Sequence, residues 1–378
     1  MRNFLKLCAL FVGVATAVAI VLPLLPAFGG HVALGGGAWI APFVFLIAID
    51  KTRNLPSIVV ANTAQDNVRA ATTAENNVRT ERYNMRVRGQ VDITAAGTGL
   101  RNRGSILAAI TDTGFSDGGT DKVVIDARLN RFVAEQFSPS PLSFTRLAAA
   151  GVQAATQLEE IMPIMLSAPR TINAGDTKYV EVNKQSQLQV FITPLRLITR
   201  LAAGGALVGT VTNLTVTVEQ IFDQLTTVAP WLTAYVRQIV QDVAGANPAL
   251  KIDLRGSRYV RGLAIQQDTN EGEVADIINE LVLRGDNASI LGDRGIPFRD
   301  LVLAQGYENG GAIPDGYLLH DFCNYARLTA SWNPNQDTNL RIEAGVQPSV
   351  GNTGSKIRVA MLEYERTAVT ADPMPYNI

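Results

Sequence analysis

The sequence predicts a mainly β protein, with two consecutive β-sandwich halves and short helices behind an N-terminal apolar helical hairpin. The first fifty residues are almost entirely apolar, whereas the rest of the 378-residue chain has the composition of a folded body. From Asn84 onward, short runs of alternating apolar and polar residues lie between clusters of Gly, Asn and Asp, which is typical of half-buried strands joined by turns. A chain of this length has room for two or three domains.

Residues 1–50 contain two apolar stretches, Phe4 to Leu22 and Trp39 to Ile49, which are separated by prolines and by the triplet Gly35-Gly36-Gly37. The first stretch is long enough to cross a bilayer. Positive residues flank both outer ends, so both ends would lie on the same side of a membrane. We therefore expect a membrane-associated hairpin. The alternative is a cleaved signal peptide, which also begins with positive charges before an apolar core.

Residues 51–83 are polar and poor in apolar residues, and we interpret them as a solvated linker or arm. The first β-rich half follows at 84–220. Its first strand is predicted from Met85 to Ile93, where apolar and polar residues alternate. Later strands are predicted by the same pattern at the following places: 123–125, 180–182, 188–192 and 214–218.

Two helices are predicted, one in each half. The first would cover Phe144 to Ile161 and end at Pro163, and the second would cover Thr233 to Val243, where apolar residues recur every three or four positions. The second β-rich half covers 221–370 and is followed by a tail at 371–378. Its strands are predicted at 259–265, 281–283, 328–332, 340–346 and 357–361.

The charge and the rare residues exclude several kinds of function. The formal net charge is −1, so nothing in the composition favours sequence-specific nucleic acid as a partner. The only cysteines, Cys8 and Cys323, are isolated, and the only histidines are His31 and His320. This makes a disulfide framework or a zinc site untenable, and no cofactor is predicted. Arginine outnumbers lysine 26 to 7, which favours fixed planar contacts at interfaces.

Three sites resemble catalytic or binding motifs, and each has a simpler explanation. Asp112-Thr113-Gly114 matches the tripeptide of aspartic proteases, but those enzymes need two such aspartates and the chain has one copy. Gly97-Thr98-Gly99 lacks the spacing of a phosphate-binding loop, so a hairpin turn explains it better. His320 lies beside Asp321 without a nucleophile motif, and we expect a core or interface residue. No catalytic residue is therefore predicted, and the protein is not expected to be an enzyme.

A basic stretch near the start of the first half offers a different kind of site. Four arginines, Arg79, Arg82, Arg86 and Arg88, could face lipid phosphates if the hairpin holds the protein at a membrane. The alternative is an ordinary solvated strand face with acidic neighbours.

Three segments resemble those of a known family: 100–107 (LRNRGSIL), 123–128 (VVIDAR) and 356–363 (KIRVAMLE). Together with the layout of two β-sandwich halves, they are similar to the major capsid proteins of tailless, membrane-containing icosahedral bacteriophages, the tectivirus and corticovirus-like lineage. The resemblance covers roughly residues 84–367. It implies that the two halves are jelly rolls, at 84–220 and 221–370. The apolar hairpin departs from the pattern, because those proteins lie over the membrane without crossing it.

The resemblance implies a structural protein of the virion. Three copies would form a pseudo-hexagonal tile that contacts neighbouring capsomers, a vertex or penton protein and an internal lipid bilayer. The competing hypothesis is a membrane-anchored bacterial β-sandwich that serves as a binding or adhesion module. The two hypotheses differ in oligomeric state, since a tile must be a trimer that buries large interfaces.

Overall fold

The fold is described from a computed structural model of the chain. All described residues belong to one compact unit. They are 51–60, 68–75, 78–137, 144–167, 178–180, 186–224, 232–286, 289–309, 312–323, 331–333, 339–346 and 354–366. The predicted apolar hairpin and the C-terminal tail lie outside these ranges. Within them, no helix has the length and apolar character needed to span a membrane.

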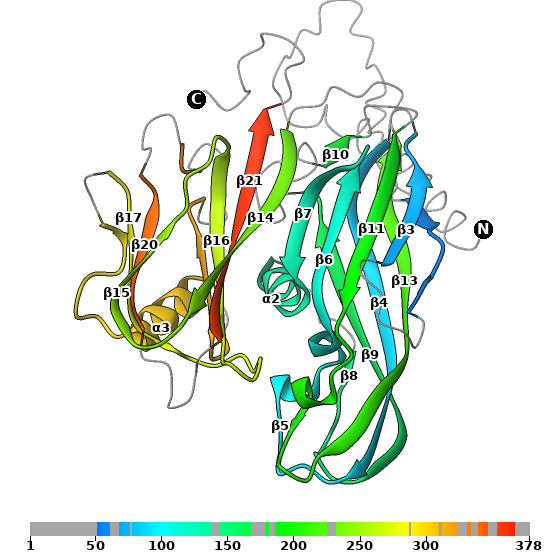
Figure 1. The fold of residues 1–378 in the computed structure, drawn as a ribbon. Coiled ribbons are helices and arrows are strands. Elements are labelled where there is room, and N and C mark those ends of the chain that lie inside the picture. Colours follow the sequence, from blue (N-terminus) through cyan, green and yellow to red (C-terminus); the bar gives the residue numbers. More distant parts are fainter. Residues whose placement is uncertain are drawn as a thin grey trace, which may run out of the picture. The chain divides into compact units, whose positions relative to one another are not determined.

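The described residues form two β-sandwiches that share one continuous sheet (Figure 1). The shared sheet has eight strands in the order β19-β16-β21-β14-β7-β6-β11-β3. These strands are β3 (Val68–Thr73), β6 (Ile110–Asp117), β7 (Thr120–Asp126), β11 (Gln187–Pro194), β14 (Leu232–Val243), β16 (Tyr259–Asp268), β19 (Tyr317–Asp321) and β21 (Ser355–Arg366). Its two halves meet where β14 pairs with β7 in parallel, with Val236 opposite Val123.

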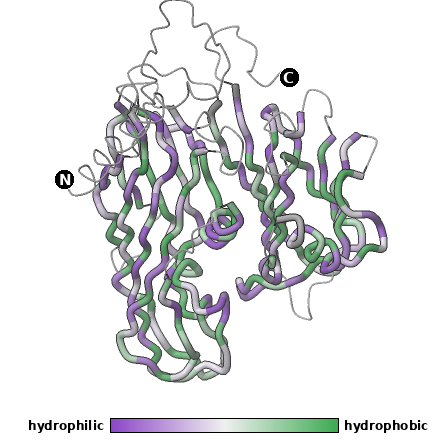
Figure 2. The backbone as a smooth tube through the Cα atoms, turned by 180° about the vertical axis from the view of Figure 1, so that it is seen from behind, coloured by the Kyte–Doolittle hydropathy of each residue, from purple (hydrophilic) through white to green (hydrophobic). Residues whose placement is uncertain are grey.

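The first sandwich packs the β7-β6-β11-β3 half of the shared sheet against a seven-stranded sheet. That sheet contains β1 (Lys51–Asn54), β2 (Ile58–Val59), β4 (Val78–Ala95), β8 (Phe144–Thr145), β9 (Gln153–Met165), β10 (Tyr179–Val180) and β13 (Val208–Gln224). Its core is formed by the inward side chains of both layers. Tyr83 of β4 stacks on Phe115 of β6 with ring centroids 5.4 Å apart, and both side chains are fully buried. Apolar and polar residues alternate along the strands (Figure 2), as expected for strands that have one face toward a core.

The second sandwich packs the other half of the shared sheet against a four-stranded sheet in the order β15-β20-β17-β18. These strands are β15 (Asn247–Asp253), β17 (Ile278–Arg284), β18 (Ser289–Leu291) and β20 (Arg341–Val346). Two short strands, β5 (Gly99–Leu100) and β12 (Ala202–Ala203), pair separately. The helical elements are α2 (Ala127–Phe137), α3 (Phe298–Asn309) and the 3-10 turns η2 (Asn102–Gly104), η3 (Ile106–Ala109) and η5 (Ile198–Arg200).

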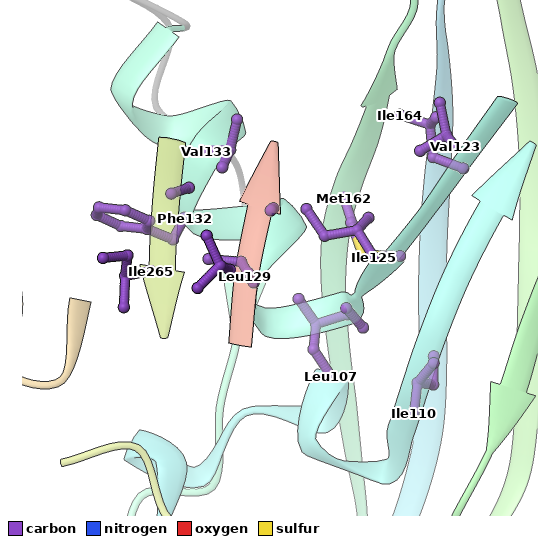
Figure 3. Close-up of a cluster of buried hydrophobic side chains, with 14 of the residues drawn as sticks. Leu107, Ile110, Val123, Ile125, Leu129, Phe132, Val133, Met162, Ile164 and Ile265 are labelled. Atoms are coloured by element: carbon purple, nitrogen blue, oxygen red, sulfur yellow. The ribbon is translucent and has the colours of Figure 1, made fainter. Parts of the chain in front are cut away.

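Helix α2 joins the apolar cores of the two sandwiches. Its residue Phe132 stacks on Tyr317 of β19 with ring centroids 4.6 Å apart, and Leu129 is fully buried. Figure 3 shows the side chains of α2 beside residues of both sandwiches: Leu107, Ile125, Leu129, Phe132, Val133, Met162 and Ile265. Because this apolar cluster is continuous, the sandwiches bury surface against each other as well as within themselves.

Both predicted helices are wrong. The segment from Phe144 to Ile161 contains β8 and most of β9, and the helix of the first sandwich is α2. Alternate residues of β9 face the core, and the strand pairs with β4 over nearly its whole length. Pro163 is tolerated inside β9 because its other neighbour, β8, pairs only with Glu159 and Glu160.

The segment from Thr233 to Val243 is strand β14, which pairs with β21 along its full length. Its apolar residues recur at helical spacing, but the residues that would share one face of a helix are not all buried. Tyr235 is buried whereas Val240 is 43% exposed. Strand pairing on a large sheet has overridden the local periodicity, as tertiary context commonly does.

The prediction of a solvated linker or arm at 51–83 is also wrong, because the described residues of this segment form strands. Residues 51–83 include β1, β2, β3 and the start of β4, all of which pair within the two sheets of the first sandwich. Their side chains are polar because several face outward, while Val78 and Thr80 are buried. The strands predicted at 85–93, 123–125, 188–192, 214–218, 259–265, 281–283, 340–346 and 357–361 are confirmed in β4, β7, β11, β13, β16, β17, β20 and β21.

Candidate functional site

The boundary between the two sandwiches contains a cluster of buried charged groups. Asp126 is completely buried, and Arg128 and Asp268 are 4% and 2% exposed. We call the following residues the junction cluster: Asn102, Asp126, Arg128, Asp268, Gly272 and Arg358. Three come from the first sandwich and three from the second, so the cluster links the two halves of the protein.

Arg128 is the centre of the cluster. Its Nη2 donates to Asp126 Oδ2 at 2.9 Å and to Asp268 Oδ2 at 3.0 Å. Its Nη1 donates to Asn102 Oδ1 at 3.0 Å and to the carbonyl oxygen of Gly272 at 2.8 Å. The planar guanidinium therefore bonds to both sandwiches at once, a geometry for which arginine is suited and lysine is not.

Local structure fixes the position of Asp126 and Arg128. Asp126 ends β7 and caps α2, because its Oδ1 accepts the backbone N–H groups of Arg128 at 2.9 Å and Leu129 at 3.4 Å. The cap places Arg128 in the first turn of α2, within reach of Asp126. Across the boundary, Gln238 of β14 accepts the backbone N–H of Asp126 at 2.7 Å.

Charge pairing makes the burial of these groups tolerable. Arg358 Nε on β21 donates to Asp268 Oδ2 at 3.0 Å and lies 3.4 Å from Asp126 Oδ2. Burial alone would raise the pKa of Asp126, but Arg128 and Arg358 outweigh it and hold the pKa below its usual 3.8. Burial opposes the charge of Arg128 as well, while Asp126 and Asp268 raise its pKa. The charges of two aspartates and two arginines thus compensate each other.

Asn102 provides a second link across the boundary. It lies in the left-handed region with φ of 48°, where Asn is favoured over most residues. Its Nδ2 donates to the carbonyl oxygen of Gly272 at 3.0 Å, and its Oδ1 accepts the backbone N–H of Val274 at 3.2 Å. Gly272 has φ of +73°, and a Cβ at this position would overlap the side chain of Arg200. The loop therefore requires glycine here.

A cavity of about 260 Å³ lies beside the junction cluster and is lined by residues of both sandwiches. Its charges are mostly matched. Arg131 pairs with Glu135 at 2.7 Å, and Arg146 pairs with the buried Glu160 at 3.3 Å. The arrangement can hold the two sandwiches in a fixed orientation, and the residues that line the cavity include no nucleophile beside a base.

Asp112, the aspartate of the protease-like tripeptide, lies in the middle of strand β6 rather than on a catalytic loop. Burial and the nearby Asp126 raise its pKa, and Gln238 Nε2 donates to its Oδ1 at 3.4 Å. Gly114 is explained by packing, because a Cβ there would lie 2.3 Å from the ring of Phe191. The tripeptide is therefore part of the sheet next to the junction cluster.

The remaining residues singled out from the sequence take part in hydrogen bonds or packing within the fold. Gly97-Thr98-Gly99 lies at the end of the first sandwich, where Thr98 N donates to the carbonyl oxygen of Ala203 at 2.6 Å. His320 on β19 lies 3.2 Å from Gln305 Oε1 through its Nδ1 and contacts the ring of Phe322. Cys323 is buried, and burial raises the pKa of its thiol to about 11.

The four arginines proposed to face lipid all lie on β4, and each has an acidic neighbour. Arg79 pairs with Asp223 through two bonds of 2.9 Å, and Arg82 pairs with Glu81. Arg86 and Arg88 are exposed and share Glu159 on the neighbouring strand at 3.3 and 2.7 Å. This arrangement compensates their charge within the outer face of the sheet.

The three segments that carried the family resemblance meet at the junction cluster. Segment 100–107 contributes Asn102, segment 123–128 contributes Asp126 and Arg128, and segment 356–363 contributes Arg358. From the sequence, none of these residues has a predicted role, and neither has Asp268. The signal was present as an aspartate and an arginine two positions apart at the end of a strand, where a helix cap is favoured.

Several solved structures of viral capsid proteins have a similar fold. The solved capsid protein of Sulfolobus turreted icosahedral virus superposes with a TM-score of 0.60 at 11% identity, covering 83% of this chain and 96% of that one. The major capsid protein of bacteriophage PM2 superposes with a TM-score of 0.51 at 12% identity, covering 86% and 100%. The PBCV-1 virus capsid gives 0.54 at 11% identity, covering 83% and 93%. No protein-family profile and no curated protein matches the sequence.

The chain is therefore similar in fold to the double jelly-roll major capsid proteins, and the resemblance suggested by the sequence is confirmed. These neighbours are capsid proteins of virus particles.

Proposed function

We propose that the protein is a major capsid protein and a component of the virion. In this proposal its two sandwiches are consecutive jelly rolls, and three copies form a pseudo-hexagonal tile over an internal lipid membrane. The observation that carries the proposal is the likeness of fold, which extends over most of this chain and nearly all of the capsid proteins compared. The neighbouring capsomers and a vertex or penton protein are its proposed partners.

The junction cluster supports this role physically. A capsid tile needs its two jelly rolls at a fixed orientation, since a small rotation would misplace every contact to its neighbours. The buried Arg128 pairs with Asp126 of the first sandwich and Asp268 of the second. This provides such a constraint, because sliding one sandwich against the other would leave a buried charge without its partner. The continuous eight-stranded sheet adds a second constraint.

We also propose that residues 1–50 contact the lipid and that Arg79 and Arg82 lie at the lipid-facing end of the first sandwich, with Arg86 and Arg88 further along the same strand. Lys51, the first described residue, pairs with Phe222, and Phe222 also pairs with Thr80. The chain thus enters the sheet close to Arg79. Arginines at this position could bind lipid phosphates in addition to their acidic neighbours.

Light scattering of the purified full-length protein in mild detergent tests the tile. We expect the mass of a trimer that persists at micromolar concentration, because tiles bury large subunit interfaces. A monomer at that concentration would refute the tile and favour the membrane-anchored binding module. Flotation with anionic and neutral vesicles tests the lipid contact, and Arg79→Gln/Arg82→Gln should reduce binding to the anionic vesicles only.

A further inference from the structure

The cavity beside the junction cluster is lined by more hydrogen-bond donors than the fold uses. Its volume is about 260 Å³, and four arginines line it: Arg103, Arg128, Arg131 and Arg146. A water molecule occupies about 30 Å³ in the liquid, so this space admits a four-oxygen anion with some of its water. Arg128 and Arg131 donate to the carboxylates and carbonyl groups around them. The other two arginines keep donors that have no acceptor in the described part of the chain.

Arg103 and Arg146 carry these unused donors. Arg103 is exposed, and its guanidinium makes no ion pair or hydrogen bond with any residue that the structure describes. Arg146 Nη2 pairs with the buried Glu160, but Arg146 Nε is buried and has no hydrogen-bond partner among the described residues. A buried N–H group without an acceptor is destabilising and rare in folded proteins, unless water or a ligand supplies the acceptor.

Two hydroxyl groups add donors, one from each sandwich. Ser105 is only 6% exposed, and its Oγ accepts the backbone N–H of Leu107 at 3.2 Å, which leaves the hydroxyl hydrogen available. Tyr317 of β19 stacks on Phe132, and its hydroxyl has no partner within the described ranges. Figure 3 shows Leu107 and Phe132, which form part of the apolar wall of the cavity. Burial raises the pKa of Tyr317, so its hydroxyl keeps the proton that it can donate.

The carboxylates of the cavity decide which anion it can bind. Glu135 pairs with Arg131, and Asp315 pairs with Arg299. Glu273 also lines the cavity, but it forms no ion pair with another described residue. An ionised carboxylate can only accept hydrogen bonds. It therefore repels a fully ionised anion, whereas it binds the hydroxyl group of an anion that still carries a proton.

We propose that this cavity is a binding site for inorganic phosphate in its protonated forms. The arginines and hydroxyl groups would donate to the ionised oxygens, and hydrogen bonds of this kind are stronger than those between neutral groups. Glu273 would accept the hydrogen that inorganic phosphate retains at neutral pH. Sulfate has a similar shape but no such hydrogen, so Glu273 would exclude it. The bound anion would join Arg103 and Ser105 of the first sandwich to Tyr317 of the second. This site goes beyond the capsid role and does not depend on it.

Isothermal titration calorimetry of the full-length protein in mild detergent tests the site, with sodium phosphate and sodium sulfate at pH 7 and equal ionic strength. The wild-type protein should bind phosphate at least ~tenfold more tightly than sulfate. Arg103→Gln and Tyr317→Phe should each weaken phosphate binding by ~tenfold or more, because each removes a hydrogen bond to a charged group. The control is Arg196→Gln, because Arg196 has a φ of 50°, close to the 54° of Arg103, but does not line the cavity. It should leave phosphate binding unchanged.

Glu273→Gln tests the selectivity separately. It replaces the carboxylate by a neutral amide that can donate to either anion, so the preference for phosphate over sulfate should fall by ~tenfold or more. Thermal unfolding without phosphate shows whether each variant folds, and phosphate should raise the midpoint of the wild-type protein. The proposal is overturned if the folded wild-type protein binds no phosphate, if it binds sulfate equally well, or if Arg103→Gln and Tyr317→Phe both bind phosphate as the wild type does. These outcomes leave the tile untouched, since light scattering tests it separately.

Discussion

Replacing Arg128 by methionine is expected to separate the stabilities of the two sandwiches. The change keeps most of the apolar stem but removes the bonds of the guanidinium to Asp126, Asp268, Asn102 and Gly272. Two buried carboxylates would then share Arg358 alone. Breaking a buried ion pair by removing one partner costs about 3 to 5 kcal/mol, and we expect a loss in this range.

Thermal and urea unfolding, followed by calorimetry and by fluorescence, measure the effect. We expect a lower midpoint and two resolved transitions in place of a cooperative one, because the junction cluster couples the halves. Arg255→Met is the control: Arg255 is 68% exposed in its pair with Asp253, and such surface pairs contribute about 0 to 1 kcal/mol. Adding Asp126→Asn to Arg128→Met should restore stability, since it leaves a single Asp268–Arg358 pair. If Arg128→Met and Arg255→Met cost the same, the junction is not held by this cluster.

Three further changes have defined outcomes. Burial and Asp126 raise the pKa of Asp112, so the ionised carboxylate destabilises the fold at neutral pH. Asp112→Asn should therefore stabilise the protein by up to about 1 kcal/mol at pH 7. Denaturation at decreasing pH should show this gain vanishing as the carboxyl group of the wild-type protein becomes protonated. Gly114→Ala should lower the free energy of unfolding by about 1 to 3 kcal/mol, because the added Cβ would overlap Phe191 and Val123. In the control Gly151→Ala the added Cβ meets no atom within 4 Å, so the stability should change little. Equal urea midpoints for the two variants would contradict the packing argument. Cys323 is buried and its thiol has a pKa of about 11. In a Cys8→Ser background this thiol should therefore react with iodoacetamide at pH 8 only after urea has unfolded the chain. Rapid labelling of the native protein would show instead that Cys323 is accessible.

The sequence predicted the class of fold because strands of a sandwich have a short-range signal. In β4 the alternation from Met85 to Ile93 matches the burial of the strand residue by residue. The same signal failed in β14, where apolar residues happen to recur at helical spacing. A strand at the centre of a sheet is covered on both faces over part of its length, so its apolar residues need not alternate. The polar strands β1 and β3 were missed because their stability comes from pairing with β13 and β11.

The site was harder to predict because it is made by contacts between distant segments. Asp126 and Arg128 are neighbours in sequence, but Asp268 and Arg358 lie far along the chain and join them only after both sandwiches have formed. The four charged residues are not regularly spaced in the sequence, so no periodic pattern predicts that they meet. Asp112 attracted attention for a motif, although its actual role in the structure is to lie next to Asp126 in the sheet. A sequence motif identifies a residue type, while charge burial identifies which residues the fold depends on.

The buried charges of the junction cluster bear on how such a subunit assembles. They are acceptable within the chain because the fold holds each guanidinium against matching carboxylates. Sliding one sandwich against the other would break these pairs and leave buried charges without partners. We therefore expect the orientation of the two sandwiches to survive dissociation of the assembled protein. Hydrogen exchange should show lasting protection at β7 and β16 in the dissociated subunit.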